Sequence, residues 1–573
     1  MRSTARAPGA RARSSSVITS SISSESITPE MISVESRSSA ISGSVGVRAP
    51  CERCFTENDQ HEPLLQRGLM PSQLEELRER LAEINDLGRA RALLGWDERT
   101  QMPPAGAEVR AEQVATLARI RHELLISDEL GRLIEGAASE TESLPYDSDD
   151  ASLVRVARRG WDKARRVPAD LRAELTRAAS LAEHAWADAR ADSDFAAFLP
   201  HLQKNVELRR RYADCFDGFD DFVDEFDPLL DDFEPGMTTP EMTAVLGELR
   251  DGIRPLIAAV AESGADIDDS CLHGDFPLDA QETLAREVVT ELPLQEGAWR
   301  LDQTVHPFAT AISPADLRIT TRFEPEYIGT AVWAVIHESG HAIYENGVPK
   351  ELWRSPLASP SSLGFHESQS RLWENWVGRG RPYLERLMPR LRELFPARLG
   401  EVELDTLYRA ANKIEPSLIR VEADQVTYNL HIILRFELEL GIFDGSIDLA
   451  DLPEAWNSKV QEYLGISVPD DAQGVLQDVH WAGGMFGYFP TYSLGNVVAG
   501  QLWDRITAEL PDVEEQIGRG ELTGLREWLR ENLHRHGNKF MPKELIEKVV
   551  GGSIDVAPYV RQLHERAAEI YDI

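Results

Sequence analysis

The stretch that decides the fold of this chain is Thr330-Ala-Val-Trp-Ala-Val-Ile-His-Glu-Ser-Gly-His-Ala-Ile-Tyr-Glu-Asn-Gly347. It predicts a helix, because apolar residues fill most of its positions and Gly347 is a typical C-terminal stop. A helix that is apolar almost all round is expected to be buried. Because an unpaired polar group in the interior is costly, the polar residues His337, Glu338 and His341 must have partners.

The spacing of the two histidines indicates a metal site. His337 and His341 are four residues apart, so they lie on the same face of the predicted helix. Two imidazoles in this arrangement can bind one tetrahedral Zn²⁺, with Glu338 beside the ion as a general base. The alternative is a pair of core histidines that are hydrogen-bonded to the backbone. The zinc hypothesis requires a third protein ligand further along the chain.

Two sources of a third ligand can be excluded. A metzincin would have Gly at position 344 and His at position 347, where this chain has Tyr344 and Gly347. Glu345 lies on the same helix about 12 Å beyond His337, at a rise of 1.5 Å per residue. It is therefore too far along the helix to share an ion with both histidines, although it could orient His341 from outside the ligand set.

The remaining source is a helix that returns antiparallel to the first one. The segment 364–376 offers two carboxylates, Glu367 and Glu374. We favour Glu367, because it follows the Pro- and Ser-rich linker at 355–362 and falls in the first turn of the new helix. The predicted metal ligands are therefore His337, His341 and Glu367.

Composition limits the classes of partner. The chain has 573 residues, of which 42% are hydrophobic, so it can bury a large core. Its net charge of −37 argues against a nucleic-acid partner. The sequence contains no run of 18 apolar residues, so no membrane-spanning helix is predicted. The four cysteines are too few and too scattered for a disulfide framework, which favours a cytoplasmic protein.

The chain divides at about residue 70. Residues 1–69 are rich in Ser and Arg and are predicted to be a disordered or non-native extension. Residues 70–573 are predicted to form a single, mainly α-helical domain, with two lobes around a deep central groove. Helices are predicted from 71 to about 96 and at 107–135, 151–166, 169–190, 194–213, 239–263, 279–291, 382–394, 403–412, 417–440, 451–463, 496–510, 511–531, 542–549 and 555–571.

One short region departs from the helical pattern. Residues 302–313 and 316–323 are rich in β-formers and are joined at Ser313-Pro314, which predicts a small hairpin just before the histidine helix. A strand at the edge of a groove can pair with an extended peptide. A purely structural ribbon is the alternative.

Several motifs together resemble the carboxypeptidase Taq family of thermostable zinc metallocarboxypeptidases. The resemblance runs from about residue 71 to the C-terminus. The motifs are His306-Pro-Phe308, Asp316-Leu-Arg-Ile-Thr320, His337-Glu-Ser-Gly-His341, His366-Glu-Ser-Gln369, Ile419-Arg-Val-Glu-Ala-Asp424 and Gln477-Asp-Val-His-Trp481.

The resemblance implies one Zn²⁺ per chain, for which Co²⁺ can substitute, with Glu367 as the third ligand and Glu338 as the general base. It implies a homodimer that acts on peptides, removing C-terminal residues one at a time with broad specificity but acting poorly on C-terminal Pro. It also implies roles for five further residues. Arg318 and Arg420 would bind the substrate carboxylate, His306 would belong to the substrate site, and His480 and Tyr492 would lie near the scissile carbonyl, with Tyr488 as the alternative to Tyr492.

Two other functions remain open. The same metal site could serve a zinc endo-oligopeptidase, in which the arginines do not close the groove. A zinc-stabilised helical protein that binds peptides without cleaving them is the third hypothesis. Glu338 argues against it, because a purely structural zinc site needs no base and has four protein ligands.

Overall fold

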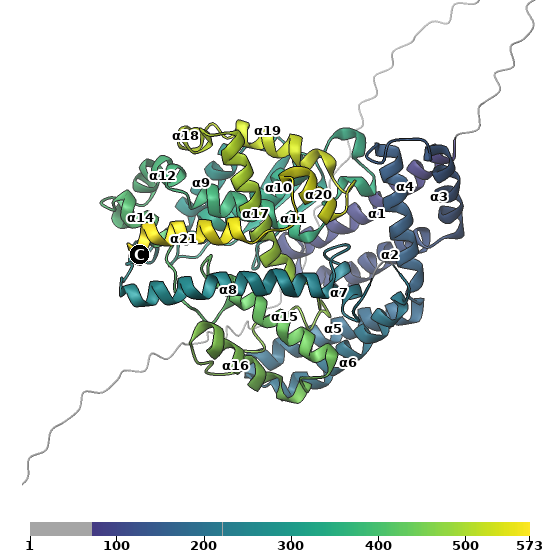
Figure 1. Ribbon diagram of the computed structural model, residues 1–573, viewed down its shortest axis with the longest axis horizontal. Coiled ribbons are helices and arrows are strands. Elements are labelled where there is room, and N and C mark those ends of the chain that lie inside the picture. The colour runs from purple at the N-terminus through teal and green to yellow at the C-terminus, as the bar shows by residue number, and fades with distance from the viewer. Residues whose placement is uncertain (1–71, 220–221) are drawn as a thin grey trace, which may run out of the picture. The chain divides into compact units, whose positions relative to one another are not determined.

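The computed structural model describes residues 72–219 and 222–573 of the chain (Figure 1). These residues form many helices and one small three-stranded sheet, which confirms the predicted mainly helical fold. These described residues belong to one compact unit. None of the helices in the described ranges is both long and apolar enough to cross a membrane. The predictions for residues 1–69 lie outside the described residues.

The α-helices follow one another along most of the chain. Their bounds are α1 Gln73–Thr100, α2 Ala107–Leu125, α3 Asp128–Thr141, α4 Asp149–Arg166, α5 Ala169–Asp192, α6 Phe195–Ala213, α7 Asp227–Asp231, α8 Thr239–Ser263, α9 Leu278–Glu291, α10 Val335–Asn346, α11 Leu363–Arg371, α12 Arg381–Leu394, α13 Pro396–Leu399, α14 Leu404–Ala411, α15 Tyr428–Asp444, α16 Leu452–Leu464, α17 Pro490–Glu509, α18 Val513–Arg519, α19 Thr523–Asn532, α20 Pro542–Val550 and α21 Ala557–Tyr571.

The predicted helices 107–135 and 417–440 have different bounds in the structure. The predicted helix 107–135 is divided into α2 and α3 at Ser127, whose hydroxyl accepts a hydrogen bond from the Leu130 amide and so caps α3. The predicted helix 417–440 begins only at Tyr428. Before it, the Asp424 carboxylate accepts hydrogen bonds from the next amides, including that of Thr427. This local bonding competes with helix formation and leaves the 417–427 segment irregular, apart from one 3₁₀ turn.

The predicted C-terminal helices differ in a similar way. Helix α17 begins at Pro490 rather than at residue 496, because the fixed φ of proline suits the first helical turn. The predicted helix 511–531 is divided into α18 and α19 at Gly520, whose φ of +76° ends α18.

The sheet is larger than the predicted hairpin. It contains β1 (Trp299–Gln303), β2 (Ala309–Ser313) and β3 (Asp316–Thr321) in the order β1-β3-β2. Strands β2 and β3 form the antiparallel hairpin, while β1 pairs in parallel with β3. The single predicted strand 302–313 is thus two strands, and Pro307, which has no amide hydrogen to donate, lies in the break between them.

Apolar side chains gather in two clusters. The smaller cluster joins α1, α3 and α4 to residues 348–358. The larger cluster contains the buried side chains of α10, α11, α15 and α17 together with those of the C-terminal helices. Helices α8 and α21 lie side by side (Figure 1), and the His564 ring of α21 is hydrogen-bonded to the Gly252 carbonyl of α8. The helices that carry the predicted metal ligands therefore belong to the larger core.

Candidate metal centre

Helix α10 holds the two histidines in a fixed position. It follows a π-helical turn at Thr330–Ala334, and its apolar side chains are buried. Turns of this kind are rare and often occur at functional sites. The rings of His337 and His341 lie on the same face, with 5.1 Å between their centroids. The predicted helix of residues 330–347 is therefore present, with a π-helical first turn.

Helix α11 lies directly against α10. The Ser362 hydroxyl caps its N-terminus by accepting a hydrogen bond from the Phe365 amide. Gly340 allows the two helices to approach, because a Cβ at that position would lie 2.7 Å from the Ser370 Cα. Gly495 of α17 does the same on the other side of α11, where a Cβ would lie 2.7 Å from the Glu367 Cβ. These two close approaches fix the place of Glu367 opposite the histidines.

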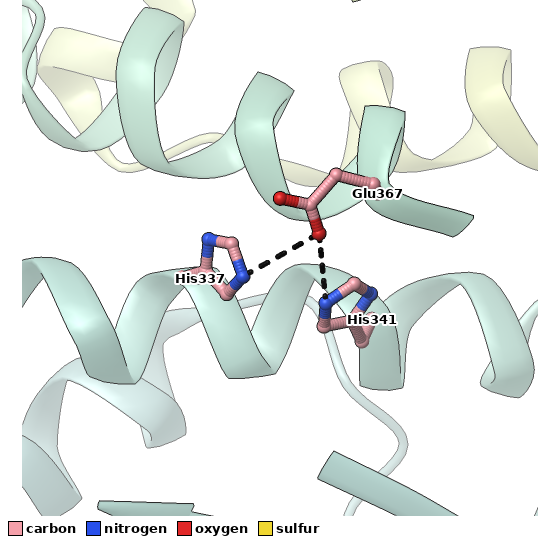
Figure 2. Close-up of side chains that lie close together, drawn as sticks. All are labelled: His337, His341 and Glu367. Carbon is pink, nitrogen blue, oxygen red and sulfur yellow. Dashed lines mark ion pairs between the residues drawn. The ribbon is translucent and has the colours of Figure 1, made fainter. Parts of the chain in front are cut away.

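Figure 2 shows the three side chains converging between α10 and α11. One oxygen of Glu367, Oε2, lies 3.7 Å from His337 Nε2 and 3.5 Å from His341 Nε2. Donor atoms of all three residues lie within 4.8 Å of one another. The two histidines and the glutamate are thus brought together from two helices.

The donor set suits a metal ion. Two imidazole nitrogens and one carboxylate oxygen are typical ligands of catalytic Zn²⁺, at about 2.0–2.1 Å from the ion. Around a tetrahedral ion such ligands lie roughly 3.3–3.4 Å from one another, close to the two observed distances. Burial and the charges of neighbouring imidazoles hold the pKa of His341 well below its usual value, so its ring is neutral and able to bind a metal.

Groups outside the ligand set orient both rings. His337 Nδ1 lies 3.0 Å from Glu374 Oε2, and His341 Nδ1 donates to the His366 carbonyl at 3.1 Å. Glu374, the second candidate from the sequence, therefore contacts the far side of His337. Although burial opposes its ionisation, the hydrogen bond to His337 and the nearby arginines hold the pKa of Glu374 well below its usual value. Partners of this kind fix the ring orientation and raise ligand basicity.

From the sequence, Glu345 could orient His341, but the structure gives it a different partner. Glu345 Oε1 instead lies 3.6 Å from Nε2 of His366. The His366 ring stacks on that of His341, with 4.1 Å between centroids. A residue one turn further along α10 cannot reach past the His366 ring, so the His366 carbonyl takes this role.

Arg371 is a residue that the sequence interpretation missed. Its Nε donates to Glu367 Oε1 at 2.7 Å, and its NH1 donates to Glu374 Oε2 at 3.4 Å. Its guanidinium also lies over the Tyr428 ring, 4.5 Å from the centroid. Arg371 thus occupies the Glu367 oxygen that faces away from the histidines. Its position four residues after Glu367 on α11 was the only signal in the sequence.

Arg371→Met is expected to weaken metal binding by about 10- to 100-fold, because Glu367 loses the partner that fixes its orientation. Competition with a chromophoric chelator measures the affinity without reference to any reaction. Arg381→Met, which removes a half-buried arginine paired with Asp405 and Glu569, is the matched control. Equal affinities for the two variants would show that Arg371 does not position the ligand.

Glu338 lies between the two histidines in sequence and is buried. Burial raises the pKa of its carboxyl group to about 7, with smaller effects from His337 and Glu367. The backbone of Ala309, the first residue of β2, faces this carboxylate and favours its ionised form. The small sheet thus borders the metal centre at the edge of the cavity.

The three metal-site residues open onto a cavity of about 1160 Å³. Glu338, Tyr488 and Tyr492 also line it, together with Phe308 from the segment before β2. Six cationic side chains reach its wall: Arg322, Arg371, Arg379, Lys413, Arg420 and Arg566. The cavity is large enough to hold a peptide and leaves one side of the metal centre accessible.

Arg420 lines the cavity but is already paired. Its Nε and NH2 donate to Asp478, the shorter contact being 2.7 Å, and its NH1 donates to the Tyr428 hydroxyl. Asp478 also accepts from the buried Arg435. These arginines hold the pKa of Asp478 well below its usual value, although burial opposes its ionisation. Two cations share one carboxylate, so the group keeps a net positive charge beside the cavity.

The predicted groups for the scissile carbonyl lie together. His480 Nε2 is 3.3 Å from the Tyr492 hydroxyl, and the Tyr488 and Tyr492 rings are 5.3 Å apart. Both tyrosines line the cavity, whereas His480 stands behind Tyr492. Burial raises the pKa of both phenols, so each carries a proton that it can donate.

The other two predicted substrate residues do not line the cavity. Arg318 donates from Nε and NH2 to Asp316, at 2.6 and 3.0 Å, and lies over the Trp96 ring. His306 is exposed in the segment between β1 and β2, although its neighbours Pro307 and Phe308 reach the cavity. The structure therefore separates Arg318 and His306 from the residues around the metal site.

Comparisons with known proteins agree with this geometry. The family model described as carboxypeptidase Taq (M32) metallopeptidase matches residues 76–567. Thermostable carboxypeptidase 1 of Thermus thermophilus is 42% identical over 84% of this chain and 95% of its own length. Carboxypeptidase 1 of Bacillus subtilis is 37% identical over 86% of this chain and 97% of its own length. The crystal structure of the M32 carboxypeptidase from Deinococcus radiodurans has a TM-score of 0.84 and 37% identity, and the match covers 87% of this chain and 100% of that one. The chain therefore belongs to the carboxypeptidase Taq (M32) family of metallopeptidases.

Proposed function

We propose that the chain is a zinc-dependent metallocarboxypeptidase that releases C-terminal residues from peptides one at a time. We further propose that its specificity is broad and that it acts poorly on C-terminal Pro, as the family resemblance suggests. The observation that carries the proposal is the convergence of His337, His341 and Glu367 on a large cavity, with Glu338 beside them. The relatives that match this chain over nearly their whole length are named carboxypeptidases, which supports the proposal.

The residues around the metal have distinct roles in this proposal. When bound by His337, His341 and Glu367, Zn²⁺ would activate a water molecule and polarise the scissile carbonyl. The Glu338 carboxylate would accept the proton of the attacking water and pass it to the leaving amine. Tyr492 or Tyr488 would donate a hydrogen bond to the oxygen on which negative charge develops, which is worth roughly 3 kcal/mol. His480, hydrogen-bonded to Tyr492, would orient that hydroxyl.

An exopeptidase must also recognise a free carboxylate. Arg420 is the better placed of the two predicted arginines, because it lines the cavity and belongs to a group with net positive charge. Arg318 is held by Asp316 away from the cavity wall. A role for Arg318 or for His306 in substrate binding therefore stays a prediction that requires movement of the segment around β2 and β3.

The endo-oligopeptidase hypothesis remains the second candidate, and one observation favours it. The Nε and NH2 groups of Arg420, which would bind the terminal carboxylate of a substrate, already donate hydrogen bonds to Asp478. Amidated peptides distinguish the two candidates, because they lack the free carboxylate and keep every peptide bond.

The protein is expected to shorten free-acid peptides stepwise and scarcely to cleave amidated ones. Losing one charged hydrogen bond costs about 1.5–3 kcal/mol, so Arg420→Ala should lower kcat/KM for free-acid peptides by about 10- to 150-fold. Arg318→Ala is the matched variant and should have a smaller effect. Internal cleavage of amidated peptides at a comparable rate would exclude the carboxypeptidase proposal in favour of the endo-oligopeptidase.

We also propose a homodimer in the cytoplasm, with Zn²⁺ replaceable by Co²⁺. The resemblance to the family supports the dimer and the metals. The cysteine pattern supports the compartment, and both cysteines among the described residues, Cys215 and Cys271, are free. Sedimentation equilibrium would test the oligomeric state.

A further inference from the structure

One cation on the cavity wall differs from the other five. Arg322, Arg371, Arg379, Lys413 and Arg420 each form an ion pair with an acidic side chain. Arg566, on α21, has no such partner among residues 72–219 and 222–573, although the chain carries 97 acidic residues against 60 basic ones. An unpaired guanidinium in a strongly acidic protein needs an explanation.

Neutral oxygens hold Arg566 in place. Its NH1 donates to Gln425 Oε1 at 2.8 Å and to Asn412 Oδ1 at 3.2 Å. Its Nε and NH2 have no hydrogen-bond partner within the part of the chain that the structure describes. Burial lowers the pKa of Arg566 from its usual value, and the charge of Arg379 acts in the same direction. The guanidinium is thus fixed at one corner, while its other edge remains available.

Arg566 is connected to the metal centre by a chain of contacts along the same wall. Asn412, which holds Arg566, donates from Nδ2 to the Arg379 carbonyl at 3.1 Å. The Arg379 guanidinium donates to Glu374 Oε1 at 3.0 Å, and the other oxygen of Glu374 contacts His337. Arg566 is therefore linked through Asn412 and Arg379 to the residues that orient the metal ligands, and all of them line the same cavity.

We propose that Arg566 forms an anion subsite of the cavity and binds a carboxylate of the peptide substrate, either its terminal carboxylate or an Asp or Glu side chain. This inference rests on the proposed function, since it assigns a part of the same substrate. A carboxylate can accept two hydrogen bonds from one edge of a guanidinium. Such a ligand would form the ion pair that Arg566 forms with no side chain in the described ranges, where Glu569 of the same helix acts on it without an ion pair. A purely structural role, in which Arg566 connects α21 to Asn412 and Gln425, would explain the hydrogen bonds of NH1 but not the unused Nε and NH2 groups.

Binding to a protein that does not turn over tests the proposal separately from catalysis. In the full-length, zinc-loaded Glu338→Gln variant, isothermal titration would measure the affinity for a free-acid pentapeptide with Glu at one of its last three positions. The comparison peptides replace that Glu by Gln or the terminal carboxylate by an amide. Adding Arg566→Gln should abolish the preference for one carboxylate, a loss of about 10- to 100-fold. If replacing one of the two carboxylates no longer lowers the affinity once Arg566→Gln is present, that carboxylate is the one that Arg566 binds.

Lys413→Gln is the matched control, because Lys413 is the neighbour of Asn412 on the same wall but is already paired with Glu415 and Asp269. It should leave every carboxylate preference intact. The subsite is excluded if Arg566→Gln also leaves all preferences unchanged, or if the parent variant shows no preference for a carboxylate at any position. Failure of the wild type to cleave peptides would instead refute the proposed function and leave this binding result unaffected.

Discussion

Replacing Glu338 by Gln is expected to lower kcat by about 10²- to 10⁴-fold, the range typical of a lost general base. The amide is nearly the same size as the carboxylate but cannot accept a proton from the attacking water. The side chain lies beside both histidines without being one of the three converging donors. Stopped-flow or mass-spectrometric assay of a free-acid peptide, at saturating substrate, measures the effect.

The control for this variant is its metal content. Zinc measured by elemental analysis and the thermal midpoint should both match those of the wild type, because Glu338 is not one of the converging donors and Gln has nearly the same size. A variant that is fully loaded with zinc and keeps substantial turnover would refute the role of Glu338 as the base.

The second large effect is expected from Glu367→Ala, which should abolish stable metal binding. Loss of a group that only orients a ligand costs about 10- to 100-fold in affinity, so loss of a ligand should cost more than about 100-fold. Glu374→Ala should fall in the smaller range, because Glu374 contacts the outer nitrogen of His337. Equilibrium dialysis against zinc buffers compares the two affinities.

These two variants distinguish the candidates that the sequence left open. The reverse order, with Glu367→Ala retaining zinc and Glu374→Ala losing it, would make Glu374 the third ligand. Because both carboxylates are buried beside Arg371, circular dichroism on each variant is needed to show that the fold survives.

The metal helix could be predicted because its signal is local. Two histidines four residues apart share a helical face whatever the rest of the fold does. Glu367 could be predicted for a related reason, since a linker rich in Pro and Ser fixes where the next helix begins. Glu345 shows the limit of this argument. Its distance from the metal along the helix was clear from sequence, but the His366 ring that separates it from His341 comes from α11.

The surroundings of the site depend on contacts that spacing does not encode. Arg420 is paired with Asp478, which lies 58 residues away in the chain, and only the fold brings them together. The same applies to Arg566, whose partners Asn412 and Gln425 lie in the loop region before α15. The start of α15 was missed because the Asp424 side chain bonds to the next amides, which overrides the apolar pattern of residues 417–427.

Peptide ladders read by mass spectrometry, with and without a chelator, test the central claim most directly. The untreated protein should convert a free-acid peptide into products that are successively one residue shorter from the C-terminus. Chelation should stop the ladder, and stoichiometric Zn²⁺ should restore it in the wild type but not in Glu367→Ala. A ladder that persists after the metal has been removed, or internal fragments in place of one, would contradict the account.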